Sequence, residues 1–147
     1  MIPTFTTVEA RLELTSKWAA RYGLDARMVC AVIEQESNWN AGAVRFEPAF
    51  LAHYIAALNL PLLQSLDRST SWGLMQIMGQ VAIENGFTGN LPDLRDPDTG
   101  VDFGCRKLQK CFQVHGADEA GLLAYNGGGN PDYGKQVLAR ISHYPEG

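Results

Sequence analysis

The fold and the site are both predicted from one stretch, ARMVCAVIEQES at residues 26–37. Within it, Val29, Val32 and Ile33 recur at the three- and four-residue spacing that gathers side chains on one face of a helix. Glu36 stands at the end of this apolar stripe. Glu34 is two residues earlier, which is about 200° of helical rotation away. We therefore expect the Glu36 carboxyl to face the interior and the Glu34 carboxyl to face solvent.

A carboxyl on the inner face of a helix points to a chemical role. Burial in apolar surroundings disfavours the ionised form and raises the pKa of a carboxyl group. A raised pKa is what a general acid needs near neutral pH, so Glu36 is a candidate proton donor. The structural alternative is that Glu36 caps the helix end or pairs with a neighbouring group.

Apolar residues recur at helical spacing along most of the chain, in segments separated by Gly, Pro and Asn residues. This spacing predicts a short helix after Pro61, a long one from Asp96, and others over roughly 7–22, 25–37, 48–58, 72–78, 79–85, 118–126 and 132–141. The long helix carries an apolar stripe of Val101, Cys105, Leu108 and Phe112. Alternating strand patterns are nearly absent. We expect a mainly α, single helical domain over residues 1–147, with at most a small β-hairpin at 38–47 or 65–72.

The composition is that of a globular domain with a modest negative charge. Of 147 residues, 46% are hydrophobic and 19% are charged, which suffices for a packed core. The net charge of -4 argues against nucleic acid or an anionic membrane as a partner held by charge. The apolar stretch at 48–63 is interrupted by His53, Asn59 and Pro61, and it is shorter than the roughly 20 apolar residues of a membrane span. We therefore expect no membrane insertion.

The cysteine and histidine residues indicate in which compartment the chain folds and whether it binds a metal. Three cysteines, an odd number, predict free thiols and folding in a reducing compartment. His53, His115 and His143 lack the spacing of a zinc site, so no metal is expected. The N-terminal residues lack the basic and apolar regions of a secretory signal.

Two further motifs combine glycine with polar side chains. The first, SWGLMQIM at residues 71–78, has Gly73 for close backbone approach and Gln76 as both donor and acceptor. The second, AYNGG at residues 124–128, ends a predicted helix with a phenol and an amide. Each motif alone is weak, because Met and Leu clusters are usually core and Asn before Gly usually ends a helix. Their order after Glu36 is the informative feature.

Taken in order, Glu36-Ser37, Gly73-Leu74-Met75-Gln76 and Ala124-Tyr125-Asn126 with its following glycine resemble the signature of the soluble-type lytic transglycosylases, within the lysozyme-like superfamily. The resemblance covers residues from about 20 to 142. It implies a lysozyme-like α+β fold with the hairpin beside an active-site groove. It also implies the substrate: glycan strands of bacterial peptidoglycan, cleaved at the β-1,4 bond between N-acetylmuramic acid and N-acetylglucosamine.

The resemblance assigns roles residue by residue. Glu36 is the general acid and then the base, and the product is a 1,6-anhydro sugar, formed without a metal or organic cofactor. The candidate substrate-binding residues, within or beside the motifs, are Ser37, Trp39, Ser71, Met75, Gln76, Tyr125 and Asn126. Trp39 is included because an indole face can stack on a sugar ring, and Trp72 shares that argument.

The interval between Glu36 and Gly73 is longer than the family pattern predicts. The excess holds VRFEPAF at residues 44–50 and an apolar helix. In one interpretation this insert is a lid or a groove wall, and Glu47 caps the helix that follows it. In the other, Glu47 lies across the cleft from Glu36 as a second carboxylate, and the enzyme is a hydrolytic muramidase. Asp67 is a weaker candidate for the same role.

The sequence also leads to expectations about which organism makes the protein and where the protein acts. The sequence favours a bacteriophage endolysin or virion-associated enzyme, monomeric, made in the host cytoplasm and acting on the cell wall in the periplasm. The alternative source is a bacterium, with the enzyme's secretory signal peptide removed from the sequence. A non-catalytic, glycan-binding phage component is the alternative function, although the intact set of Glu36, Gln76, Tyr125 and Asn126 argues against it.

Overall fold

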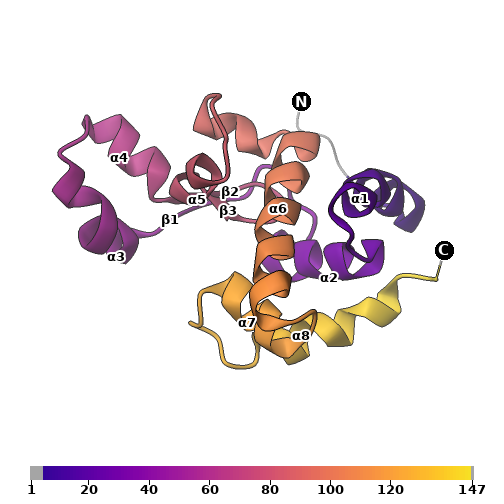
Figure 1. Ribbon diagram of the computed structural model, residues 1–147. Helices are drawn as coiled ribbons and strands as arrows, with labels where there is room; N and C mark the ends of the chain where they lie inside the picture. The colour runs from indigo at the N-terminus through magenta and orange to yellow at the C-terminus, as the bar shows by residue number, and fades with distance from the viewer. Residues whose placement is uncertain (1–4, 147) are drawn as a thin grey trace.

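Helix α2 (Ala26–Ser37) lies within the helical body of the structure, a computed structural model that describes residues 5–146 (Figure 1). Its first turn is capped by Asp25, whose side chain accepts a hydrogen bond from the amide of Arg27. All six residues from Met28 to Ile33 are buried. Helix α2 is therefore covered on more sides than its apolar stripe predicts.

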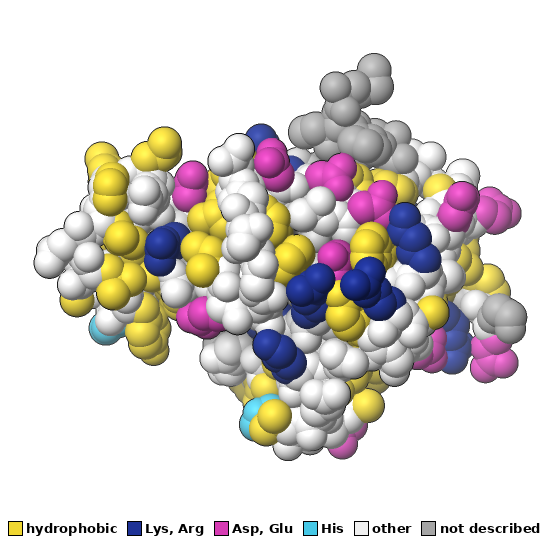
Figure 2. All heavy atoms as spheres, turned by 45° about the horizontal axis from the view of Figure 1, so that its top comes forward, with side chains coloured by type: hydrophobic (Ala, Val, Ile, Leu, Met, Phe, Trp, Pro, Cys, Tyr) yellow, Lys and Arg dark blue, Asp and Glu magenta, His cyan; other side chains and the backbone are white. Residues whose placement is uncertain are grey.

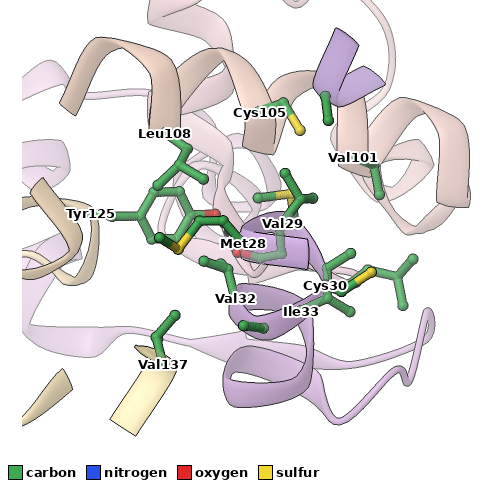
Figure 3. Packing of buried hydrophobic residues seen from close by; sticks show 14 of the residues in the cluster. Met28, Val29, Cys30, Val32, Ile33, Val101, Cys105, Leu108, Tyr125 and Val137 are labelled. Atoms are coloured by element: carbon green, nitrogen blue, oxygen red, sulfur yellow. Dashed lines mark hydrogen bonds between the residues drawn. The ribbon is translucent and has the colours of Figure 1, made fainter. Parts of the chain in front are cut away.

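Four helices surround α2 and form the main core. They are α1 (Val8–Tyr22), α6 (Pro97–His115), α7 (Glu119–Asn126) and α8 (Tyr133–Arg140). Helices α1 and α8 pack on α2, α6 packs on α1 and α7, and α7 packs on α8. Side chains from α2, α6, α7 and α8 meet in one cluster (Figure 3). The predicted stripe of the long helix is confirmed, since Val101, Cys105 and Leu108 are fully buried.

A small antiparallel sheet lies beside this helical body. Its strands are β1 (Val44–Phe46), β2 (Thr70–Trp72) and β3 (Ile77–Met78), in the order β1-β2-β3. Val44 pairs with Trp72, and Ser71 pairs with Met78. Both regions named for a hairpin contribute a strand, but these strands pair with each other across a long insert. The mainly helical, lysozyme-like fold is confirmed.

The insert between β1 and β2 forms a helical lobe that extends away from the body (Figure 1). It contains α3 (Pro48–Phe50), the π-helical η1 (Leu51–Ile55), the 3-10 helix η2 (Ala56–Leu58) and α4 (Leu62–Arg68). The helix predicted over 48–58 thus begins at Pro48 but changes type along its length. The exposed large hydrophobic side chains of the lobe and its strand are Val44, Phe46, Tyr54, Leu58, Leu62 and Leu63. Figure 2 shows apolar side chains on this lobe, at the left of the view.

The prediction of a helix over 72–78 is wrong. Trp72 pairs with Ile77 in the sheet, and a turn separates them. Gly73 has φ of 75° and Gln76 has φ of 49°, backbone conformations that a right-handed helix does not contain. The apolar residues of this segment pack on other elements rather than along one helical face.

The remaining elements complete the chain around the sheet and the C-terminus. They are α5 (Gly79–Glu84), η3 (Leu91–Arg95) and η4 (Ile141–His143). Among residues 5–146, no helix combines the length and hydrophobicity needed to cross a membrane.

Candidate active site

Glu36 lies in the last turn of α2 and is largely buried, as its sequence pattern predicts. The phenol of Tyr133, the first residue of α8, donates a 2.6 Å hydrogen bond to its Oε2. Burial raises the pKa of Glu36, and the hydrogen bond from Tyr133 and the charges of Lys107 and Arg45 offset only part of that rise. The carboxyl is therefore poised to hold a proton at a higher pH than an exposed glutamate does.

Lys107 places a half-buried cation close to this carboxyl. It extends from α6, donates a 2.7 Å hydrogen bond to the carbonyl oxygen of Tyr125, and has its Nζ 4.3 Å from the centre of the Tyr125 ring. Burial lowers the pKa of Lys107, whereas the negative charge of Glu36 raises it. Each group thus favours the charged form of the other while burial disfavours both charges.

Arg45 brings a second cation to the site from the sheet. It lies on β1 and is exposed, and its Nε is 3.1 Å from Oε1 of Glu47. Glu47 occupies the N-cap position of α3, but its side chain makes no capping hydrogen bond. The expected capping role is therefore wrong in its detail, because the Glu47 carboxylate pairs with Arg45 instead.

The Gly-Leu-Met-Gln motif is a turn docked on both α2 and α7. Ser37 donates from Oγ to the carbonyl oxygen of Leu74 at 2.7 Å. Tyr125 donates from its phenol to the next carbonyl, that of Met75, at 2.7 Å. Gln76 donates from Nε2 to the carbonyl oxygen of Ala43 at 3.0 Å. The structure thus brings together the three motifs that the sequence shows in order.

Four of the candidate substrate-binding residues are buried in this structure. Trp39 is 4% exposed, and its indole donates a 2.8 Å hydrogen bond to the phenol of Tyr144 in the core. The Trp39 side chain thus turns inward in this structure, and its place in a groove stays a prediction. Ser71, Met75 and Tyr125 are buried as well, and their contacts with substrate stay predictions. Trp72 is likewise buried.

The other three candidates keep polar atoms near the surface. Ser37, Gln76 and Asn126 are each half-buried. Asn126 accepts a 2.8 Å hydrogen bond at Oδ1 from the amide of Asn130, which shapes the glycine loop after α7. Their contact with substrate stays a prediction.

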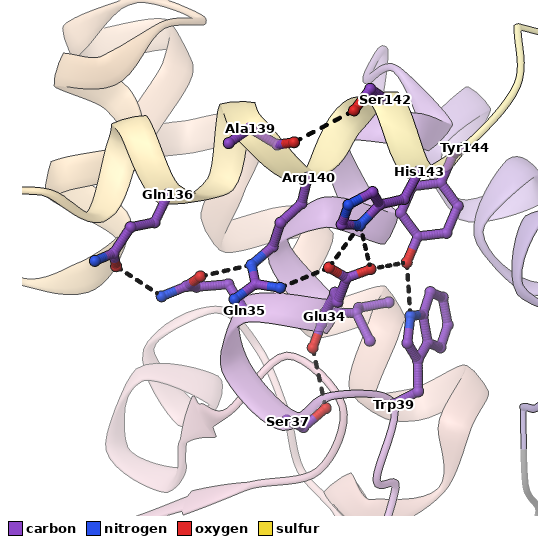
Figure 4. Close-up of polar contacts among 11 residues, drawn as sticks. Glu34, Gln35, Ser37, Trp39, Gln136, Ala139, Arg140, Ser142, His143 and Tyr144 are labelled. Atoms are coloured by element: carbon purple, nitrogen blue, oxygen red, sulfur yellow. Dashed lines mark hydrogen bonds and ion pairs between the residues drawn. The ribbon is translucent and has the colours of Figure 1, made fainter.

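The expectation that Glu34 faces solvent is also wrong. Its side chain is 10% exposed because the C-terminal segment covers it (Figure 4). Burial alone would raise the pKa of Glu34, but hydrogen bonds from Arg140, Tyr144 and His143 outweigh burial and lower the pKa. Glu34 and Glu36 thus differ in their partners and in the direction of their pKa shifts, although two positions of one helix carry both.

Sequence reasoning missed Tyr133, Lys107 and Arg45. Tyr133 begins a predicted helix far along the chain from Glu36, and no local pattern links the two. No sequence pattern distinguishes Lys107 from the other lysines of its helix, or Arg45 from the rest of the insert. Only the three-dimensional packing of α6, α8 and β1 around α2 reveals them.

A cavity of about 430 Å³ lies elsewhere, between α1 and the start of α6. It shares no lining residue with the Glu36 cluster. Its lining residues are Phe5, Ala10, Glu13, Leu14, Lys17, Asp96, Pro97 and Asp98. Within residues 5–146 there is no group of three His, Cys, Asp or Glu side chains that could hold a metal ion.

The helical body, the small sheet and the buried carboxyl at the end of α2 define a lysozyme-like domain. The transglycosylase SLT domain model matches residues 13–140, a span that includes all three motifs, so the chain belongs to this family. The family comprises lytic transglycosylases, which cleave peptidoglycan, and the chain is an enzyme of this class. No solved structure matches the chain.

Proposed function

We propose that the chain cleaves the β-1,4 bond between N-acetylmuramic acid and N-acetylglucosamine, with Glu36 as general acid and then base, and that it forms 1,6-anhydro-muramic products. One observation carries this proposal: a buried Glu36 carboxyl with a raised pKa, held at one oxygen by Tyr133. A carboxyl that stays protonated near neutral pH can deliver a proton to a leaving oxygen.

Tyr133 also determines which carboxyl oxygen carries the proton. Because the phenol donates to Oε2, that oxygen acts as an acceptor and the acidic proton resides on Oε1. In the first step, Oε1 gives this proton to the glycosidic oxygen as the bond from C1 of N-acetylmuramic acid breaks. The substrate's own acetamido oxygen forms a new bond to C1, so no second protein carboxylate is required.

The same carboxylate then acts as the base. Glu36, now ionised, takes the proton of the C6 hydroxyl of the same sugar, and O6 attacks C1 as the bond to the acetamido oxygen breaks. The product is a 1,6-anhydro ring, and Glu36 regains its proton. The positive charges of Lys107 and Arg45 stabilise the carboxylate between the two steps.

The surroundings of Glu47 favour this reaction over a hydrolytic one. The charges that act on Glu36 are the cations Lys107 and Arg45. Glu47 is paired with Arg45 at 3.1 Å, so its negative charge is compensated by the cation beside it.

Substrate contacts come from the half-buried polar residues. Gln76 uses Nε2 toward Ala43 and Gly73, and among the described residues its Oε1 accepts no hydrogen bond. Asn126 uses Oδ1 toward Asn130, and in the same part of the chain its Nδ2 donates none. We assign Gln76 Oε1 as an acceptor and Asn126 Nδ2 as a donor for sugar hydroxyl or acetamido groups, with the Ser37 hydroxyl beside Glu36.

We also infer a monomer, made in a bacterial cytoplasm as a bacteriophage lysis or virion-associated enzyme and acting on the periplasmic wall. The three free cysteines, of which Cys30 and Cys105 are buried, fit synthesis in a reducing compartment. Light scattering is expected to give the mass of one chain. Cytosolic expression is expected to leave bacteria intact until their membrane is permeabilised, and lysis without permeabilisation would contradict this setting.

The test of the catalytic assignment compares Glu36→Gln with Glu47→Gln on purified peptidoglycan. Glutamine keeps the shape and the acceptor for Tyr133 but has no acidic proton, so clearing is expected to fall by at least about 100-fold in Glu36→Gln. Glu47→Gln is expected to clear within about twofold of wild type. The opposite pattern, with Glu47→Gln inactive and no anhydro ends, would favour the muramidase.

A further inference from the structure

Helix α8 is attached to consecutive residues of α2, beginning at Glu36. Tyr133, at the start of α8, donates to Glu36 Oε2 at 2.6 Å. About one turn later, Gln136 accepts at Oε1 a 2.9 Å hydrogen bond from Nε2 of Gln35 (Figure 4). The same Oε1 accepts from Nδ2 of Asn130 at 2.8 Å, which ties the loop before α8 to the contact.

The far end of α8 is attached to Glu34. Arg140 donates from Nη1 to Glu34 Oε2 at 2.6 Å and from Nε to Gln35 Oε1 at 2.8 Å. Tyr144 donates to Glu34 Oε1 at 2.9 Å, and His143 Nδ1 lies 2.9 Å from Oε2. Figure 4 shows these side chains converging on one carboxylate. Because Glu34 is 10% exposed, this ion pair is screened by water less than a surface pair.

The three attachments lie on one face of α8. Tyr133, Gln136 and Arg140 are three and four residues apart, the spacing that places side chains on the same side of a helix. The fully buried Val137 packs in the core beside them. At the surface of a helix, about 5–6 Å from its axis, a rotation of about 10° moves an atom by roughly 1 Å. A hydrogen bond at one end of α8 leaves that rotation poorly determined, whereas a second attachment at the other end fixes it.

We propose that Glu34 and Arg140 are positioning residues for the reaction: their ion pair fixes the rotation of α8 and so holds the Tyr133 hydroxyl on Oε2 of Glu36. This inference rests on the proposed role of Glu36 as the acid. The two glutamates of α2 then have separate roles in the reaction. Glu36 transfers the proton, and Glu34 anchors the helix that decides which Glu36 oxygen carries it.

A variant in which Glu34 no longer holds α8 is expected to change the pH dependence of the reaction rate. The groups that face Glu36 come from four elements: Tyr133 of α8, Lys107 of α6, Arg45 of β1 and Tyr125 of α7. The Tyr133 hydrogen bond favours the ionised carboxyl, so its loss raises the pKa of Glu36 and moves the alkaline limb of the rate profile to higher pH. Releasing α8 removes this one contact and leaves the two cations in place.

The first experiment is a double-mutant cycle of Glu34→Ala and Tyr133→Phe, with kcat and KM measured on soluble glycan strands. Each single variant is expected to lose about tenfold in kcat, with KM within about twofold and the alkaline limb at higher pH. If Glu34 acts through Tyr133, the double variant has the same kcat and the same alkaline limb as Tyr133→Phe. Losses in kcat that multiply would overturn the inference.

Variants at the other partner supply the control and the rescue. Lys135→Ala removes an exposed cation from α8 and is expected to behave as wild type. Arg140→Ala is expected to match Glu34→Ala, and Arg140→Lys, which keeps a charge for Glu34, is expected to recover most of the loss. Wild-type activity in Arg140→Ala would contradict the inference. If Glu34→Ala does not fold, Glu34→Gln replaces it in the cycle.

A carbon NMR titration of the Glu36 carboxyl separates this inference from the proposed function, because it requires no turnover. The pKa of Glu36 is expected to rise in both Tyr133→Phe and Glu34→Ala. An unchanged titration in folded Glu34→Ala would overturn the positioning role even if Glu36 is the acid. Conversely, activity retained by Glu36→Gln would end the proposed function, and the titration would still decide whether Glu34 positions Tyr133.

Discussion

The hydroxyl of Ser37 donates a 2.7 Å hydrogen bond to the carbonyl oxygen of Leu74. The phenol of Tyr125 donates a bond of the same length to the next carbonyl, that of Met75. Two hydroxyl groups, one beside Glu36 and one from α7, therefore hold successive carbonyls of a single turn. This turn therefore joins the first and third motifs of the sequence in space.

Ser37→Ala is expected to loosen this turn. The Leu74 carbonyl loses its donor, and leaving a buried acceptor unpaired costs about 1–3 kcal/mol. In a domain of this size that loss lowers the thermal midpoint by roughly 2–10 °C. Calorimetry checks it, with Ser142→Ala as the control, because Ser142 is exposed and makes only a 3.4 Å contact. Equal midpoints for Ser37→Ala and wild type would contradict the account.

The two cations near Glu36 are expected to differ in their sensitivity to salt. A positive charge lowers the pKa of a nearby carboxyl, so Lys107→Met and Arg45→Gln both raise the pKa of Glu36 and move the alkaline limb to higher pH. Lys107 is half-buried, whereas Arg45 is 75% exposed. High salt should therefore abolish the difference between Arg45→Gln and wild type but not that of Lys107→Met. Rate profiles at about 0.05 and 1 M salt measure this, and identical salt responses would argue against the assigned burial.

Glu36→Gln is expected to stabilise the fold at neutral pH. The pKa of Glu36 is higher in the folded protein than in the unfolded chain, so folding favours the neutral form. The stability that this group contributes is complete below its unfolded pKa and is lost as pH rises through the folded pKa. Glutamine avoids that loss, and we expect a gain in stability near pH 7 that disappears at a pH below the unfolded pKa of about 4.3. Urea unfolding at the two pH values checks the sign, and a variant destabilised at pH 7 would contradict it.

Gly73→Ala and Gly127→Ala form a matched pair that tests the motif turn. Both glycines have positive φ, of 75° and 84°. A Cβ at Gly73 would lie 2.5 Å from the carbonyl oxygen of Leu94, whereas at Gly127 it would meet nothing within 4 Å. We expect a loss of about 1 kcal/mol at Gly127 from backbone strain, and more than about 3 kcal/mol at Gly73, where a clash is added. Similar losses in the two variants would show that the turn does not pack on Leu94.

The sequence predicts the helical elements well where one buried stripe dominates. The long helix with Val101, Cys105 and Leu108 and the central helix with Glu36 follow from periodicity, because each packs an apolar face on the core. Prediction fails over 72–78, where Gly73 and a short sheet override helical spacing. Such a turn is stabilised by partners distant in the sequence, which local patterns do not show.

The inward position of Glu36 is predicted from the sequence, but the residues that surround it are not. Glu36 is found because its place in an apolar stripe is a local property. Tyr133 and Lys107 reach it only through tertiary packing. The error at Glu34 has the same origin, since helical rotation separates it from Glu36 but cannot reveal that Arg140 and Tyr144 cover it.

Mass spectrometry of the fragments released from purified peptidoglycan tests the central claim most directly. Wild-type protein is expected to release fragments ending in 1,6-anhydro-muramic acid, lighter by one water than hydrolysis products, and Glu36→Gln is expected to release none. Reducing muramic ends from the wild-type protein, or anhydro ends from Glu36→Gln, would contradict it.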